Sequence, residues 1–200
     1  MTVKDIALYY KAKQAGQDAD KYKQQADKYE SVLTGEVTEF VIPDGWTKIR
    51  QGAFNACREL VGVTIPNNIT SIEATAFSSC SKLKSAAISA GVTSIKGSAF
   101  YGCVALTDIT IPNTITTISV GAFTNCSKLT NVTIGSGFNC NNLDLSASTK
   151  YSADTLVAMF TALADRTGQE AYTLTLGSTN LAKLNDEQKA IATDKNWTLA

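Results

Sequence analysis

Cysteines and carboxylates are the residues with which this 200-residue chain could do covalent, metal-binding or acid–base chemistry, because the sequence contains no histidine. The absence of histidine excludes Ser-His and Cys-His catalysis and histidine-based metal sites. Five cysteines without a CxxC pair indicate neither a zinc site nor a complete disulfide framework. The sequence also lacks a glycine-rich phosphate loop and a nucleophile elbow, and we identify no glycosidase-like pair of carboxylates. We therefore expect no catalytic residue, no metal, no cofactor and no enzymatic activity.

The charge balance argues against two classes of partner. Eighteen basic residues balance 18 acidic residues, so the formal net charge is zero. Such a chain has no electrostatic footprint for a phosphate backbone or an anionic lipid surface, and we expect no nucleic-acid partner. The opening segment, MTVKDIALYYKAKQ, is too charged for a signal peptide, and no window reaches the roughly 18 apolar residues of a membrane span. We therefore expect no membrane insertion.

Four of the cysteines recur at intervals of 23 residues, and three apolar columns recur with them. The columns are Cys57, Cys80, Cys103 and Cys126; Phe54, Phe77, Phe100 and Phe123; Leu60, Leu83, Leu106 and Leu129; and Ile49, Ile72, Ile95 and Ile118. A fixed period of this length predicts a solenoid in which each copy forms one coil. Stacking of the coils would place each phenylalanine on the next and build a continuous core.

One copy, VTIPNNITSIEATAFSSCSKL, shows which elements a coil should contain. Residues 63–65 and 69–72 are typical of two short strands, separated by the turn Pro66-Asn67-Asn68. The segment from Glu73 to Leu83 carries its apolar residues on one side and predicts a helical or 3₁₀ turn.

These copies resemble the BspA-like leucine-rich repeat family, whose repeats run from an IP strand end through a VTSIG-like segment to AFxxCxxL. The resemblance extends from about Glu36 to Ile134, with departures at Ser89 and Gly135 in the proline column and at Ala86 in a strand column. It implies an α/β leucine-rich-repeat solenoid of about four to five 23-residue coils with short parallel strands, which we assign to residues 35–142. It also implies an adhesion or protein-interaction role at a cell surface.

The cysteine column has two interpretations. The regular spacing of the cysteines on the inward side of the coils favours small, buried, free thiols. Stacked positions about 5 Å apart would also lie within the range of cross-coil disulfides.

Residues 1–34 predict one helix that precedes the solenoid. Its small and apolar residues alternate steps of four and three, which is a heptad seam, and Gly35 lies where the helix should stop. The seam predicts a coiled coil that could form a homo-oligomer. The alternatives are a helix folded back on the first coil and a frayed leader.

Residues 143–200 predict an α/β cap of helices and parallel strands. The strands are expected at Leu143–Leu145, Leu174–Leu176 and Trp197–Leu199. One helix should begin after Ser152 and stop at Thr167-Gly168, and the second should begin at the capping-box residue Asn185 and end near Asn196. The first strand either joins the ladder that holds Ile118 or begins a separate small sheet.

This C-terminal segment also resembles a module of tail-associated proteins from gut phages and prophages, chiefly through TLTLGSTNLAKLNDEQKAIAT. That resemblance implies a virion component.

Two rows of threonine should face solvent, because they alternate with inward isoleucines. One row is Thr64, Thr110 and Thr133, broken by Ala87, and the other is Thr47, Thr70, Thr93 and Thr116. Together they form the predicted binding strip for a protein or glycan ligand. The function predicted from the sequence is a non-enzymatic interaction or adhesion module, and the alternative is a structural or receptor-binding part of a phage tail. The two resemblances imply a location at a cell surface or on a virion.

Overall fold

The computed structural model describes residues 39–42 and 45–200, in which short parallel strands recur, joined by turns. A five-stranded sheet has the order β1-β3-β5-β7-β9, and a four-stranded sheet has the order β2-β4-β6-β8. The first consists of β1 (Glu39–Val41), β3 (Gly62–Ile65), β5 (Ser85–Ile88), β7 (Asp108–Ile111) and β9 (Asn131–Ile134). The second consists of β2 (Lys48–Ile49), β4 (Ser71–Ile72), β6 (Ser94–Ile95) and β8 (Thr117–Ile118).

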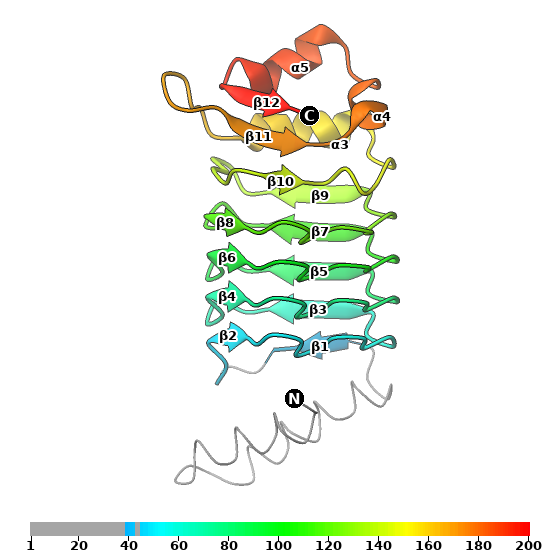
Figure 1. The fold of residues 1–200 in the computed structure, drawn as a ribbon. Helices are drawn as coiled ribbons and strands as arrows, with labels where there is room; N and C mark the ends of the chain where they lie inside the picture. The colour runs from blue at the N-terminus through cyan, green and yellow to red at the C-terminus, as the bar shows by residue number, and fades with distance from the viewer. Residues whose placement is uncertain (1–38, 43–44) are drawn as a thin grey trace, which may run out of the picture.

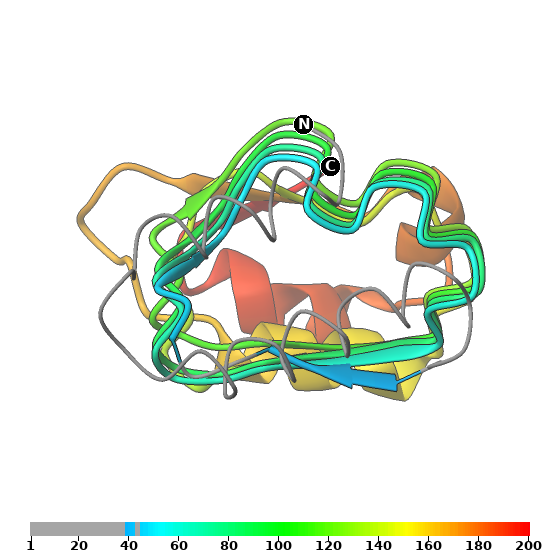
Figure 2. The same cartoon turned by 90° about the horizontal axis from the view of Figure 1, so that it is seen from below.

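The first four coils each contribute one strand to each sheet, the fifth contributes only β9, and the coils stack in register along a straight axis (Figure 1). Thr64 pairs with Ala87 in one sheet, and Ile72 pairs with Ile95 in the other, so the register is the 23-residue step of the sequence. Viewed along the axis, the coils superpose almost completely (Figure 2). The predicted solenoid of short parallel strands is therefore confirmed.

The third side of each coil, between Glu73 and Leu83 in the second copy, consists of turns. The predicted helical or 3₁₀ turn is wrong. Thr75 and Ser79 have φ values of 56° and 60°, and these left-handed residues interrupt any run of helical geometry. Some amide groups bond within the coil, but the amide of Phe54 donates to the carbonyl of Ala76 in the next coil at 2.7 Å. Backbone hydrogen bonds between coils therefore take the place of the bonds within a local helix.

The core is built from the repeated columns. The rings of Phe54, Phe77, Phe100 and Phe123 are buried and stack in sequence, with centroid distances of 5.0, 5.2 and 5.6 Å and interplanar angles of at most 12°. All five cysteines are buried free thiols, so the disulfide interpretation is not realised. The isoleucine and leucine columns are buried beside them.

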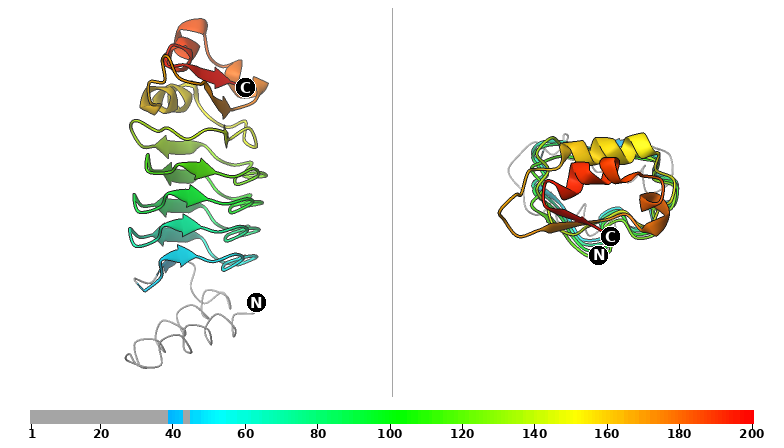
Figure 3. Two further views of the ribbon diagram at one scale, coloured as in Figure 1. Left: turned by 60° about the vertical axis from the view of Figure 1, so that its left-hand side comes forward. Right: turned by 90° about the horizontal axis from the view of Figure 1, so that it is seen from above.

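The C-terminal segment forms a separate three-stranded parallel sheet with the order β10-β11-β12. Its strands are β10 (Leu143–Asp144), β11 (Tyr172–Thr175) and β12 (Trp197–Leu199), and its helices are α3 (Ala153–Ala162), α4 (Ser178–Leu181) and α5 (Asp186–Thr193). The second alternative for the first strand, a separate small sheet, is thus the observed one. Helix α3 packs against β9, and α5 packs against α3 (Figure 3). At the C-terminal end of the solenoid, helices take the place of further strands and cover the edge of the five-stranded sheet at β9.

The helix starts agree with the sequence, but one helix end does not. The Ser152 side chain caps α3, and Asn185 forms a capping box with Gln188 at the start of α5. Helix α3 ends at Ala162, before the predicted stop at Thr167-Gly168. The ammonium group of Lys195 donates to three carbonyl oxygens at this end, those of Phe160, Thr161 and Leu163. These bonds satisfy the last carbonyls and let the chain leave the helix early.

Two remaining expectations concern the N-terminal segment and membrane insertion. The helix and coiled coil expected over residues 1–34, and the stop at Gly35, lie outside the described residues. Among residues 39–42 and 45–200, no helix has the length and apolar character needed to cross a membrane.

Candidate interaction surface

The solvent-facing side of the five-stranded sheet carries two columns of side chains. Strands β5, β7 and β9 alternate exposed and buried residues, so every second residue points outward. The strand register aligns one column of positions as Val41, Thr64, Ala87, Thr110 and Thr133, and the other as Glu39, Gly62, Ser85, Asp108 and Asn131. The sheet therefore brings the predicted residues Thr64, Thr110 and Thr133 together on one exposed face, where their hydroxyls form no hydrogen bond with another described residue.

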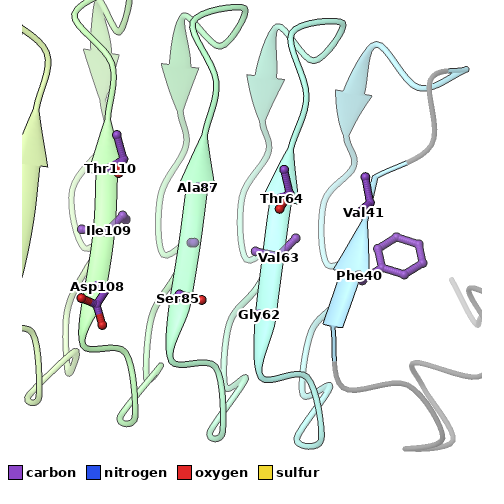
Figure 4. Close-up of a pocket in the computed structure, with 11 residues that line it drawn as sticks. Phe40, Val41, Gly62, Val63, Thr64, Ser85, Ala87, Asp108, Ile109 and Thr110 are labelled. Carbon is purple, nitrogen blue, oxygen red and sulfur yellow. The ribbon is translucent and has the colours of Figure 1, made fainter.

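A shallow hollow of about 240 Å³ lies on this face, across β1, β3, β5 and β7 (Figure 4). Its floor contains Gly62, Ser85 and Ala87, whose side chains are small or absent. Val41, which is 55% exposed, lies at the end nearest β1, and Asp108 and Thr110 lie at the other end. The break that Ala87 makes in the threonine row therefore coincides with a depression in the surface.

Asp108 holds a fixed position at the edge of the hollow. The Thr107 hydroxyl donates to one carboxylate oxygen at 2.5 Å, and the Asn131 side-chain amide donates to the other at 2.7 Å. Asn131 comes from the neighbouring strand, since it pairs with Asp108 in the register. Both donors bond to the ionised form, so the carboxylate is oriented before any partner arrives.

The second predicted row has a different role, because its hydroxyl protons are used within the fold. The hydroxyls of Thr70, Thr93 and Thr116 each donate to the carbonyl of the threonine one coil earlier, at 3.0 to 3.2 Å. The backbone amides of the same residues donate to the same carbonyls. Thr47 supplies the first of these carbonyls. This row is exposed, as expected, but its hydroxyls form hydrogen bonds between coils. It therefore has fewer free donors for a ligand than the row on the five-stranded sheet.

The thiols form a comparable ladder inside the solenoid. Those of Cys80, Cys103 and Cys126 donate to the carbonyl of the phenylalanine 26 residues earlier, at 3.0 to 3.2 Å. Burial raises the pKa of Cys57 and that of Cys126 to about 12. Thiolates are the reactive and metal-binding form, so this column is chemically inert near neutral pH. In the described part of the chain, no group of three or more cysteine or acidic residues could hold a metal ion.

Sequence reasoning missed Asp108 and the hollow beside it. It considered the carboxylates as catalytic candidates, whereas the relevant feature is one oriented carboxylate next to small residues. The signal was present as breaks in the outward columns, at Gly62 and Ala87.

Parallel strands stacked at a 23-residue step around a phenylalanine and leucine core define the class of protein: a leucine-rich-repeat solenoid. The sequence profile of the BspA type leucine-rich repeat region matches residues 29–149, in six copies. This match covers more than half of the chain, and the chain belongs to that family.

Solved structures show the same fold. A leucine-rich repeat protein from Bacteroides ovatus is 26% identical, with a TM-score of 0.50, over 70% of this chain and 34% of that one. The leucine-rich repeat protein of T. pallidum is 20% identical, with a TM-score of 0.53, over 82% of this chain and 85% of that one. The pneumococcal vaccine antigen PcpA is 16% identical, with a TM-score of 0.55, over 82% of this chain and 40% of that one. This chain thus spans about a third of the Bacteroides protein.

The comparisons leave two points without support. No curated protein sequence matches the chain. The family match ends at residue 149, and none of the structures above is described as a tail protein. The resemblance of residues 143–200 to phage tail-associated modules, and the virion role it implied, therefore stay predictions from the sequence alone.

Proposed function

We propose that this protein is a non-enzymatic interaction module that binds a protein or glycan ligand of a cell envelope through the exposed face of its five-stranded sheet. The observation that carries the proposal is the in-register face itself. Strands β3, β5, β7 and β9 present two straight columns of small, neutral and hydroxyl-bearing side chains, interrupted by the acidic residue Asp108, and the register places Glu39 of β1 at the end of the Asp108 column. A flat surface of this kind can make many weak contacts with a broad ligand.

Two further observations support the face over the rest of the described surface. The threonine hydroxyls beside the four-stranded sheet donate to backbone carbonyls, whereas Thr64, Thr110 and Thr133 remain directed outward. Membership of the BspA-type family also favours adhesion, because the family resemblance implied that role. A cell-surface location belongs to this proposal.

The test uses two triple variants with the same change in charge. Lysines at Thr64, Thr110 and Thr133 block the sheet face, whereas lysines at the exposed positions Asn55, Thr124 and Ser127 place the same charge on the turn side. Parent and variants are applied to arrays of envelope proteins and glycans. We expect the sheet-face variant to lose the ligands that the parent binds and the turn-side variant to keep them.

Thermal unfolding checks that both variants fold, because exposed substitutions usually change stability by about 0.5 kcal/mol or less. Equal binding by the folded sheet-face variant and the parent would remove this face as the binding surface.

A further inference from the structure

The hollow on the five-stranded sheet contains an oriented carboxylate that has no cationic partner within the described residues. Among the lining residues that the structure describes, Asp108 is the only one with a charged side chain. In the described part of the chain, the single salt bridge joins Lys82 to Glu59, at a different position on the coils. Lys84 immediately precedes Ser85, which pairs with Asp108 in the register, and it forms no ion pair with Asp108. The carboxylate is thus held by neutral donors and can accept a cation from outside.

The size of the hollow limits what can occupy it. Its volume of about 240 Å³ is smaller than the roughly 300–1,000 Å³ of pockets that enclose drug-sized ligands. A single long side chain matches this volume better than a cofactor or an oligosaccharide does.

The lining has two chemically different ends. Val41, Gly62 and Ala87 present an apolar surface, and Asp108 presents negative charge beside the hydroxyl of Thr110 (Figure 4). A lysine or arginine has the same division, since an aliphatic stem carries a cationic head. Among the described lining residues the one aromatic ring, that of Phe40, is 1% exposed and offers no open ring face for stacking on a sugar. The chemistry of the hollow favours a basic side chain over a glycan.

We propose that the hollow binds a lysine or arginine side chain of a protein ligand, with the stem across Val41, Gly62 and Ala87 and the cation at Asp108. This inference rests on the proposed function and specifies its partner as a protein with an exposed basic residue. Arginine can donate two parallel hydrogen bonds to a carboxylate and should bind more tightly than lysine.

The test is an NMR titration of the full chain with three small probes. They are acetyl-Ala-Arg-Ala-amide, the same peptide with uncharged norleucine, and N-acetylglucosamine. We expect saturable shifts with the arginine peptide at the amides of Gly62, Ser85, Ala87 and Thr110, and at least threefold weaker binding of the norleucine peptide. Raising the salt from 50 to 500 mM should weaken the arginine peptide, because the pair is partly open to solvent.

Two pairs of variants make the titration decisive. Asp108→Asn should weaken the arginine peptide at least threefold, whereas Asp186→Asn on the exposed start of α5 should leave it unchanged. Ala87→Lys should abolish binding by placing a cation in the hollow, whereas Ala87→Ser should retain it. Equal binding of the norleucine peptide, retention of affinity in Asp108→Asn, or preferential binding of N-acetylglucosamine would overturn the inference.

The outcome is separable from that of the proposed function. The peptide titration needs no natural ligand, and the array experiment needs no basic residue in the ligand. A sheet face that binds envelope ligands while the hollow ignores the arginine peptide would reject this inference alone.

Discussion

Replacing Phe77 by alanine removes a ring from the middle of the stack. Phe77 has no exposed surface and lies between the rings of Phe54 and Phe100, at 5.0 and 5.2 Å. Truncation of a buried phenylalanine costs about 3–5 kcal/mol, and each stacked pair contributes about 0.5–1.5 kcal/mol beyond its buried area. Because two stacked pairs are lost, we expect a cost near the upper limit, about 5 kcal/mol.

Phe123 provides the matched comparison, since it is also buried but has one stacked partner among the described rings, Phe100 at 5.6 Å. Phe123→Ala should therefore cost about 1 kcal/mol less than Phe77→Ala, the value of one stacked pair. The assay is urea unfolding followed by circular dichroism, from which the free energy of unfolding and its slope are obtained.

Leucine variants keep the experiment informative if an alanine variant does not fold. In double-mutant cycles, Phe77→Leu with Phe100→Leu should show a coupling energy of about 0.5–1.5 kcal/mol, because these rings stack. Phe54→Leu with Phe123→Leu should show close to none, because two rings separate them. Equal coupling in the two cycles would refute the stack as a source of stability.

Two other predictions concern the thiols and the C-terminal cap. Burial raises the pKa of Cys57 and that of Cys126 from the ordinary 9.0 to about 12, so between these two pH values the thiols ionise only in the unfolded chain. The stabilisation of the fold by these two buried thiols is intact below pH 9. Between pH 9 and about pH 12, each thiol should lower the free energy of unfolding by about 1.4 kcal/mol per pH unit, measurable as a falling urea midpoint. An unchanged midpoint between pH 9 and 11 would contradict this. The buried side-chain amide of Asn180 donates to two backbone carbonyls at 2.7 and 2.8 Å, so Asn180→Ala should cost about 2–3 kcal/mol in the same assay. The exposed neighbour variant Thr179→Ala should cost about 0.5 kcal/mol or less, and a similar cost for both would argue against the bonds.

The repeated columns were predictable because their period is set by the stacking itself. A residue such as Ile65 or Phe77 recurs every 23 positions only if each coil places it against its equivalents, and the register of the sheets reproduces that step. The helix caps at Ser152 and Asn185 were predictable because they use bonds within three residues.

The features that were missed depend on contacts between coils. The spacing of apolar residues from Glu73 to Leu83 suits a helix as well as a chain of turns, and only the amide bonds to the next coil select the turns. The pattern of exposed threonines likewise does not reveal that the hydroxyl of Thr93 donates to the carbonyl of Thr70. The early end of α3 depends on Lys195, which lies 33 residues beyond Ala162 in the chain.

The distance between Val41 and Thr133 tests the stacked face most directly. The two residues are 92 positions apart in the chain, yet they lie in one outward column, separated by four strand spacings. At about 4.8 Å per spacing, their Cα atoms should be about 19 Å apart. Spin labels on cysteines introduced at these exposed positions can report this distance, because the native thiols are buried and protonated. A narrow distribution near 19 Å, broadened only by the label arms, is the predicted result, and a broad distribution centred beyond 30 Å would contradict the stacked face.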